Sequence, residues 1–385
     1  MVNIPYGRQQ ITEEDIQAVT AVLQSDYLTT GPKVKEFEEK FAAYVGSNYA
    51  VAVANGTAAL HLSAMALGVS QGNKVITTPI TFAASANCVR YCGGTVDFCD
   101  IDPNTYVLDI VKVREKLETS PPGTYQGIIP VDLAGFPVDM EAFRTLAAEY
   151  NLWIIEDACH APGGWFTDKK GNHQNCGNGK FANLSAFSFH PVKHIACGEG
   201  GMITTDNKEY YEKLLQFRSH GMIYQGNPKL IENHGGWYME MQELGYNYRM
   251  PDILCALGIS QLTKANQGLE RRKEIAANYF NAFKNESFIL SQSGVVPGHA
   301  YHLYIIEVAD RLELYNYLRQ HHIFAQIHYV PVHLMPYYKE QGFKHGDFPM
   351  AERYYQRCLS IPMYPSLTDE EQDFVIQTIK DFYNN

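Results

Sequence analysis

An apolar run that ends in two acids occupies residues 154–160, which read Ile154-Ile155-Glu156-Asp157-Ala158-Cys159-His160. The run predicts a buried strand, because the strands of a parallel sheet are covered on both faces and lack polar alternation. In open α/β sheets, ligands bind beyond the carboxyl ends of the strands. Asp157 therefore lies where a functional acid is expected. Asp is also favoured as a helix N-cap, and this stretch alone supports both interpretations equally.

Similar apolar runs alternate with helical patterns on the N-terminal side of this stretch. Strands are predicted over residues 49–54, 75–78, 95–98, 127–131 and 152–155, and helices over 57–68, 81–92, 109–118 and 139–150. Such alternation is typical of a mainly parallel sheet covered by helices. Ahead of it, Thr12 followed by Asp15 predicts a helix start. Phe37, Phe41 and Tyr44 indicate a second helix.

The C-terminal half shows a different pattern. Strands predicted at 184–189 and 200–205 flank a compact loop, and a long helical region follows Pro251, which suits a first helical position, to about Phe283. Residues 171–179 and 225–240 are expected to be exposed loops. From about residue 285 we predict a smaller α+β unit, with strands over 302–308 and 323–329 and helices over 310–321, 349–358 and 368–382. The predicted domains are 1–255, with an N-terminal arm, and 256–385.

Composition excludes several classes of function. The 385 residues are 45% hydrophobic and 19% charged, which argues against a disordered chain. The net charge of −11 argues against nucleic-acid binding and against a polybasic membrane anchor. No run approaches the roughly 18 consecutive apolar residues of a membrane span. The first ten residues lack the pattern of a secretory signal, so the expected location is cytoplasmic.

The cysteines and histidines do not predict a metal site. Eight cysteines are too sparse for a disulfide scaffold, and only Cys88, Cys92 and Cys99 are clustered. Buried cysteine is common as a small apolar residue. His190 and His194 are four residues apart, but the proline between them disfavours a helix that would bring them together. We therefore expect no metal.

A second stretch with chemical character runs from Ser185 to Gly201. A predicted strand leads into a proline-bent loop that displays Lys193, and three glycines follow that allow a close approach of the backbone. A lysine held near apolar groups can have a lowered pKa and act as a nucleophile. The alternative is a surface lysine in a hairpin turn.

Two predicted strand-to-helix turns add further candidates. The first, Asn55-Gly56-Thr57-Ala58-Ala59-Leu60, would present free amides and a helix dipole to an anion such as phosphate, or would be a plain helix cap. It matches neither the Walker A motif nor the dinucleotide fingerprint. The second, residues 78–87, places Phe82 where a ring could stack on a flat cofactor, although a core position is the alternative.

Taken together, the four stretches meet the needs of one cofactor, pyridoxal 5'-phosphate (PLP). PLP requires an anion site, a lysine for its Schiff base and a carboxylate that keeps the pyridine nitrogen protonated. A stacked ring would add to binding. The same lysine, once an amino donor displaces it, is free to carry a proton. We therefore expect a PLP-dependent enzyme.

The motifs resemble those of the DegT/DnrJ/EryC1/StrS family of PLP-dependent sugar aminotransferases, from Ile4 to about Thr378. The segments that carry the resemblance are 28–32 (LTTGP), 55–60 (NGTAAL), 156–160 (EDACH), 187–193 (FSFHPVK), 198–201 (GEGG) and 245–250 (GYNYRM). The resemblance implies the α/β fold of aspartate aminotransferase (type I). That fold has three layers around a mainly parallel sheet and a smaller C-terminal α+β domain, and residues 1–255 would form the PLP-binding domain.

The resemblance also implies roles for individual residues. Lys193 would form the Schiff base and later carry the proton, Asp157 would pair with the pyridine nitrogen, and His160 would lie near the ring oxygen of PLP. The other expected cofactor contacts are Gly56, Thr57, Ala58 and Ser188 at the phosphate, Phe82 on the ring, and Asn247 from a neighbouring subunit. The expected sugar-nucleotide contacts are Tyr6, Tyr27, Leu28, Thr29, His190, His328 and Tyr329.

Within the family, three segments are similar to the UDP-4-amino-4,6-dideoxy-N-acetyl-β-L-altrosamine transaminases of pseudaminic acid biosynthesis. They are residues 4–9 (IPYGRQ), 217–222 (FRSHGM) and 326–331 (QIHYVP). This similarity implies a homodimer that moves the amino group of L-glutamate to C4 of a 4-keto-6-deoxy UDP-N-acetylhexosamine. The expected substrate is UDP-2-acetamido-2,6-dideoxy-β-L-arabino-hex-4-ulose.

Several alternatives stay open from the sequence. The substrate could be another UDP- or dTDP-keto sugar, or the reaction could be a PLP-dependent sugar dehydration. Intact Lys193, Asp157 and Ser188 argue against a non-enzymatic sugar-binding relative. The loop 224–243 is longer than the family pattern predicts, and its Trp237 and Tyr238 could contact a nucleotide base or cover a dimer seam.

Overall fold

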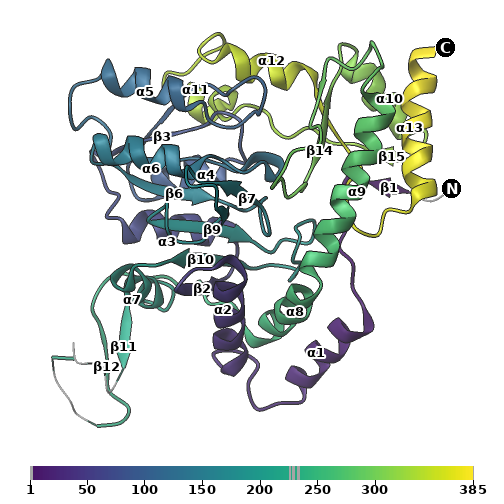
Figure 1. Ribbon diagram of the computed structural model, residues 1–385. Coiled ribbons are helices and arrows are strands. Elements are labelled where there is room, and N and C mark those ends of the chain that lie inside the picture. Colours follow the sequence, from purple (N-terminus) through teal and green to yellow (C-terminus); the bar gives the residue numbers. More distant parts are fainter. Residues whose placement is uncertain (1–2, 225–226, 228–229, 232–234, 385) are drawn as a thin grey trace.

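Seven strands form the central sheet of the molecule. The computed structural model describes residues 3–224, 227, 230–231 and 235–384 (Figure 1). The strand order is β2-β10-β9-β6-β5-β3-β4, and each neighbouring pair is parallel except the two that include β10. The predicted α/β class with a mainly parallel sheet is therefore confirmed.

The elements of the sheet lie close to their predicted positions. The strands are β2 (Tyr49–Val53), β3 (Lys74–Thr77), β4 (Thr95–Phe98), β5 (Gly127–Ile129), β6 (Trp153–Asp157), β9 (Leu184–Ser188) and β10 (Gly201–Thr205). The helices between the first five strands are α3 (Gly56–Ala66), α4 (Ala84–Tyr91), α5 (Ile110–Glu118) and α6 (Met140–Glu149). Ahead of the sheet, Thr12 and Asp15 cap α1 (Glu13–Leu23), and Phe37 and Phe41 lie on α2 (Pro32–Val45).

Helices cover both faces of the sheet, which gives the expected three layers. On β2, Val51 and Val53 pack in the cluster that includes α3 and α7 (Lys208–Phe217). Ala50 and Ala52 pack instead in the cluster of α2 and α8 (Asp252–Thr263). Successive residues of a strand point to opposite faces, so each helix pair covers one face.

The helical region after Pro251 is divided, which the sequence pattern did not predict. Helix α8 ends at Thr263, and α9 (Ala265–Phe283) starts after Lys264, which caps both helices. Lys264 Nζ donates to Asp15 Oδ2 at 2.6 Å, which ties the junction to α1. The new direction carries α9 up to the C-terminal elements (Figure 1). Pro251 has extended backbone angles and is the N-cap of α8, not its first helical residue.

The C-terminal part has its own small antiparallel sheet. It contains β13 (Ser291–Gln292), β14 (Tyr304–Glu307) and β16 (Cys358–Ile361), with helices α10 (Arg311–Gln320), α11 (Pro336–Lys339), α12 (Pro349–Arg357) and α13 (Asp369–Asn384) nearby. The strand predicted over 323–329 was too long, because only β15 (Ile323–Phe324) is formed, in parallel with β1 (Ile4–Pro5). The chain after β15 leaves this pairing and forms part of the wall of the cavity described below.

The apolar core continues across the predicted domain boundary. Residues 255 and 256 lie within α8, and the largest buried cluster includes both sheet residues and Leu303, Ile305 and Val332. A second cluster joins Ile4 to side chains of α9, α10 and α13. The division into two domains stays a prediction.

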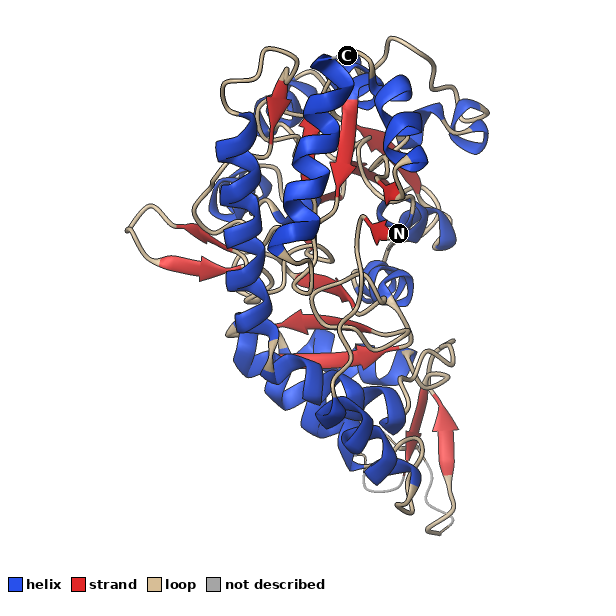
Figure 2. Cartoon of the chain, turned by 90° about the vertical axis from the view of Figure 1, so that its right-hand side faces the viewer, coloured by secondary structure: helices blue, strands red, loops and turns tan. Residues whose placement is uncertain are grey.

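Two hairpins occur where loops were expected. Strands β7 (Trp165–Thr167) and β8 (His173–Asn175) pair within and beside the expected loop 171–179. Strands β11 (Met222–Tyr224) and β12 (Met239–Met241) form a hairpin that extends away from the sheet (Figures 1 and 2). Residues 225–226, 228–229 and 232–234 of the expected loop lie outside the described residues. Within the described ranges, no helix has the length and apolar character needed to cross a membrane.

Candidate active site

A cavity of about 420 Å³ opens at the carboxyl ends of strands β6 and β9. Its walls come from these strand ends and the turns after them, the start of α3, the turn before α4, the N-terminal arm, the residue His302 before β14 and the segment after β15. The predicted site residues that line it are Tyr6, Gly56, Thr57, Phe82, Asp157, His160, Ser188, His190, Lys193, His328 and Tyr329. Tertiary structure thus brings together residues from distant parts of the sequence.

Asp157 is the last residue of β6 and is buried. Its Oδ2 accepts a 2.6 Å hydrogen bond from Ser85 Oγ on α4, and its Oδ1 accepts one of 3.2 Å from Cys159 N. Because both oxygens have partners, the carboxylate has a defined orientation in the cavity wall. A buried carboxylate held in this way is suited to a cationic N–H of a ligand.

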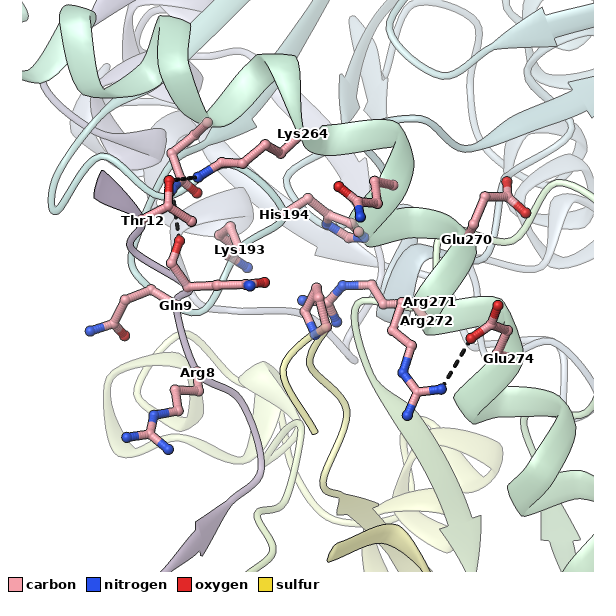
Figure 3. Close-up of a pocket in the computed structure, with 15 residues that line it drawn as sticks. Arg8, Gln9, Thr12, Lys193, His194, Lys264, Glu270, Arg271, Arg272 and Glu274 are labelled. Atoms are coloured by element: carbon pink, nitrogen blue, oxygen red, sulfur yellow. Dashed lines mark hydrogen bonds and ion pairs between the residues drawn. The ribbon is translucent and has the colours of Figure 1, made fainter. Parts of the chain in front are cut away.

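Lys193 lies in the turn after β9 and lines two cavities. One is the cavity just described, and the other has a volume of about 480 Å³ and includes Arg8, His194 and Arg272 (Figure 3). Asp157 and the start of α3 line only the smaller cavity, so we place the site there. Burial lowers the pKa of Lys193 to about 8. A fraction of this lysine is therefore a neutral amine near neutral pH, the form that attacks a carbonyl carbon.

The start of α3 and the end of β9 form an anion cradle. Asn55 is the N-cap of α3, and its Oδ1 accepts a 2.8 Å hydrogen bond from Ala58 N. Because that bond occupies the Ala58 amide, the predicted contact of Ala58 with phosphate would require the bond to break. Ala58 also does not line the cavity. The amides of Gly56 and Thr57 precede the first helical hydrogen bonds and face no such competition. A Cβ at Gly56 would lie 2.9 Å from Ser188 Cβ, so only glycine allows this close approach.

Aromatic and histidine rings line the open side of the cavity. Phe82 is 61% exposed, and its ring centroid lies 6.1 Å from that of Tyr329. Tyr329 Oη and His160 Nε2 are 3.3 Å apart, and His160 Nδ1 accepts a 3.2 Å hydrogen bond from Ala134 N. Burial, followed by the charge of Lys193, lowers the pKa of His160 well below its usual range. His160 is therefore a neutral ring near neutral pH. Because Phe82 is exposed, its ring is free to cover a flat ligand.

The N-terminal arm and the segment after β15 form another wall. The rings of Tyr6 and His328 lie 4.9 Å apart, and His328 Nδ1 is 2.9 Å from Ser360 Oγ. Burial lowers the pKa of His328 to about 3. Tyr6 is held in place by its carbonyl, which accepts a 2.9 Å hydrogen bond from Met363 N. Tyr6 and His328 thus both reach the cavity, although they are far from Asp157 in the sequence.

Besides Ala58, four predicted site residues lie outside this cavity within the single chain. Tyr27 and Leu28 are 55% and 49% exposed, and Thr29 beside them is also exposed. Asn247 is exposed and forms an isolated backbone bridge with Ser219. The structure does not bring these four side chains to Lys193.

Sequence reasoning missed three polar residues of the site. Ser85 lies in the quoted stretch 78–87, and its position four residues after Thr81 on a helix facing the sheet was an available signal. The second is His302, whose Nε2 lies 3.3 Å from Lys193 Nζ. Nothing in its local sequence marks it, because it is the first residue of the strand predicted over 302–308 and belongs to none of the motifs quoted above. Glu199, within the glycine-rich stretch, also lines the cavity.

A buried acid pair lies behind Asp157. The ligand atoms of Asp132, Glu156 and Cys176 are within 4.8 Å of one another. Glu156 accepts hydrogen bonds from Gly177 N and from Ser185 Oγ, whereas Asp132 Oδ2 has no partner among the described residues. Burial raises the pKa of Glu156 to about 7 and the pKa of Asp132 well above its usual range. The pair therefore retains a proton near neutral pH.

The donor set of the cavity fits PLP. A cradle that a Cβ at Gly56 would fill lies beside an anion-binding helix start, and an amine and an oriented carboxylate lie on the same cavity. The helix start suits the phosphate of PLP, the amine suits its carbonyl, and the carboxylate suits its pyridinium nitrogen.

The chain is similar to known proteins over nearly its whole length. A model described as the DegT/DnrJ/EryC1/StrS aminotransferase family matches residues 9–380. The spore coat polysaccharide biosynthesis protein SpsC of Bacillus subtilis is 39% identical, over 98% of this chain and 96% of SpsC. The UDP-4-amino-4,6-dideoxy-N-acetyl-beta-L-altrosamine transaminase of Campylobacter jejuni (strain ATCC 700819 / NCTC 11168) is 38% identical, over 98% of this chain and 96% of that protein.

Solved structures agree with these relatives. PseC from Helicobacter pylori, an aminotransferase of pseudaminic acid biosynthesis, superposes with a TM-score of 0.89 and 29% identity over 100% of both chains. Spr1654 from Streptococcus pneumoniae in its PLP form has a TM-score of 0.88 and 29% identity, over 100% of this chain and 99% of that chain. Fold and site thus define a PLP-dependent sugar aminotransferase. The chain belongs to the DegT/DnrJ/EryC1/StrS aminotransferase family.

Proposed function

We propose that this aminotransferase moves the amino group of L-glutamate to C4 of a 4-keto-6-deoxy UDP-N-acetylhexosamine. The specific substrate would be UDP-2-acetamido-2,6-dideoxy-β-L-arabino-hex-4-ulose, and the reaction would serve pseudaminic acid biosynthesis. The observation that carries the proposal is the 38% identity, over nearly the full length of both chains, to the altrosamine transaminase of C. jejuni.

The residues of the cavity would divide the work of this reaction. PLP, when bound, supplies an electron sink for the charge that remains when a proton leaves carbon. The amides of Gly56 and Thr57 and the hydroxyl of Ser188 would bind its phosphate, and Asp157 would hold a proton on its ring nitrogen. In the first half of the reaction Lys193 Nζ would move the proton that leaves the donor carbon to the cofactor, and in the second half it would move a proton from the cofactor to the sugar carbon. Phe82 would cover the ring and exclude water from one face.

The sugar nucleotide would enter beside the N-terminal arm. Tyr6, His190, His328 and Tyr329 line the same cavity as Lys193. Their hydroxyl and imidazole groups can hydrogen-bond sugar hydroxyls and diphosphate oxygens. Neutral His328 keeps this wall from carrying extra charge. A UDP-sugar needs only a few such donors at its diphosphate.

A second copy of the chain would complete the site. Tyr27 and Leu28 are large side chains left exposed, and Asn247 forms a backbone bridge with Ser219, just before the first strand of the β11–β12 hairpin. This hairpin extends from the body of the molecule (Figure 1). In a homodimer, these exposed residues with Thr29 would reach the partner's cavity, with Asn247 at the phosphate. This exposure is the support for a homodimer with shared active sites, and we place that homodimer in the cytoplasm.

A different keto sugar is the second candidate. Its support is the 39% identity to SpsC, whose name places it in spore coat polysaccharide biosynthesis. The residues around the amine and the phosphate would be the same in both cases. Only the sugar and base contacts would differ.

The test follows absorbance of the full-length enzyme loaded with PLP. L-Glutamate should remove the visible band, and the correct UDP-4-keto sugar should restore it, because the amino group leaves on that sugar. Lys193→Ala should lack the band, whereas Lys180→Ala, at an exposed lysine, should behave as wild type. A chain that reacts with glutamate but with no UDP-4-keto-6-deoxy sugar contradicts the substrate. A chain that takes up no PLP contradicts our assignment of the site.

A further inference from the structure

His302 makes the one hydrogen bond that the described residues provide to the Lys193 amine, with 3.3 Å between Nε2 and Nζ. It lies just before β14 and is 3% exposed. Its ring centroid is 4.3 Å from that of His160. Arg272 Nη1, on α9, donates to the His302 carbonyl at 3.3 Å. The position of the imidazole is therefore set by the surrounding fold and not by Lys193.

The buried side of the imidazole decides which nitrogen carries the proton. His302 Nδ1 is buried and has no hydrogen-bond partner among the described residues. A neutral imidazole carries one N–H and one lone pair. A proton on Nδ1 would leave a buried donor without an acceptor, which costs its full desolvation, and such orphaned donors are rarer than unpaired acceptors. A proton on Nε2 is instead directed at Lys193 Nζ, where the lone pair of an amine can accept it.

A proton on Nε2 restricts the charge of Lys193. An N–H can donate only to a lone pair, and an amine has one whereas an ammonium has none. We propose that His302 is a positioning residue that carries its proton on Nε2 and holds Lys193 as a neutral, oriented amine. This extends the role proposed for Lys193, because a neutral amine is the form that can accept a proton from carbon.

Other titratable groups face this pair from each neighbouring element. They are Asp157 on β6, Cys159 and His160 after it, His194 in the lysine turn, Arg272 on α9 and His328 after β15. Burial lowers the pKa of Lys193, Asp157 and Cys159 raise it, and Arg272 lowers it. Burial also lowers the pKa of His160, His194 and His328, so none of these rings adds a positive charge near neutral pH.

The test measures the pKa of Lys193 directly in the full-length chain after removal of PLP. Brief acetylation with acetic anhydride from pH 6 to pH 10, followed by mass spectrometry of the Lys193 peptide, reports the fraction of neutral amine. In His302→Gln, the amide oxygen can accept from an ammonium, so the preference for the amine is lost. The apparent pKa of Lys193 should rise by about one unit, the size expected for one hydrogen bond.

The matched control is His299→Gln, because His299 is another buried histidine on the same segment. His299 Nδ1 accepts from Tyr301 N at 2.8 Å and makes no contact with Lys193. It should leave the apparent pKa of Lys193 unchanged. A pKa in His302→Gln that is unchanged or lower overturns the proposal, and so does an equal rise in the control.

A second measurement is made on the wild-type chain. Nitrogen-15 NMR of ring-labelled histidine in the wild-type chain distinguishes the two neutral tautomers. The His302 ring should show its proton on Nε2, and a proton on Nδ1 overturns the proposal. Neither readout depends on amino transfer, so failure here is distinct from failure of the proposed substrate.

Discussion

Ser85 Oγ donates a 2.6 Å hydrogen bond to Asp157 Oδ2, which joins helix α4 to the end of strand β6. Both side chains are buried, and Thr81 Oγ1 lies 2.7 Å from Ser85 Oγ on its other side. A hydroxyl anchored in this way fixes the direction of the carboxylate. We therefore expect Ser85 to act on cofactor binding through Asp157.

Ser85→Ala should weaken PLP binding and turnover by roughly tenfold to a hundredfold, because a hydrogen bond to a charged group contributes about 1.5–3 kcal/mol. The PLP dissociation constant and kcat measure the effect. Ser63→Ala is the control, because Ser63 is also buried and donates only to the Ala59 carbonyl on its own helix. Equal losses in the two variants would show that Ser85 is not specific to Asp157.

Gly56→Ala should reduce PLP affinity while the chain stays folded. The new Cβ would meet Ser188 Cβ at 2.9 Å and Ser188 Oγ at 3.3 Å, which pushes the two sides of the cradle apart. Overpacking of this kind costs about 1–3 kcal/mol, or roughly fivefold or more in affinity. Equilibrium dialysis with PLP measures the loss, and circular dichroism checks the fold. Unchanged affinity would place the phosphate elsewhere.

Asp132→Asn should make stability less dependent on pH. Burial raises the pKa of Glu156 to about 7 and that of Asp132 above its usual range, so the folded chain binds more protons than the unfolded chain above about pH 4.5. Stability therefore falls as pH rises through this window. In the variant, the side chain at position 132 is neutral without binding a proton. Its amide NH2 would occupy the position of Asp132 Oδ2, which has no hydrogen-bond partner among the described residues.

Urea unfolding at pH 6, 7 and 8 measures this effect. Between pH 6 and pH 8, the free energy of unfolding should fall by about 1 kcal/mol less in Asp132→Asn than in wild type. Asp373→Asn, at an exposed position of α13, should follow wild type. Parallel curves for all three proteins would mean that the acid pair does not retain a proton.

Mixing two inactive variants should restore activity if the subunits share sites. Lys193→Ala and Asn247→Ala would damage opposite sides of one shared site, so a hybrid dimer has one intact site. After unfolding and refolding together, about a quarter of the sites should be wild type in composition. The control mixture of Lys193→Ala with Asp157→Ala damages the same side and should regain nothing. An inactive first mixture would contradict a site shared in this way.

Local sequence was enough to predict elements whose signals lie within a few residues. The strands at 95–98 and 184–189 and the helix cap at Thr12 are such cases, because apolar runs and capping side chains act locally. The break at Lys264 and the short β15 were not predictable in this way. Their conformations depend on contacts with Asp15 and with β1, which come from the other end of the chain.

The sequence by itself determined the α/β class and marked Lys193, Asp157, Gly56 and Phe82 as candidates, because each follows a strand-to-turn pattern. Only the tertiary structure decided that Ser85 holds Asp157 and that His302 contacts Lys193. These pairs are separated by 72 and 109 residues. A short pattern cannot encode such distances, because hydrogen bonds between side chains depend on where packing of the sheet and its helices places them.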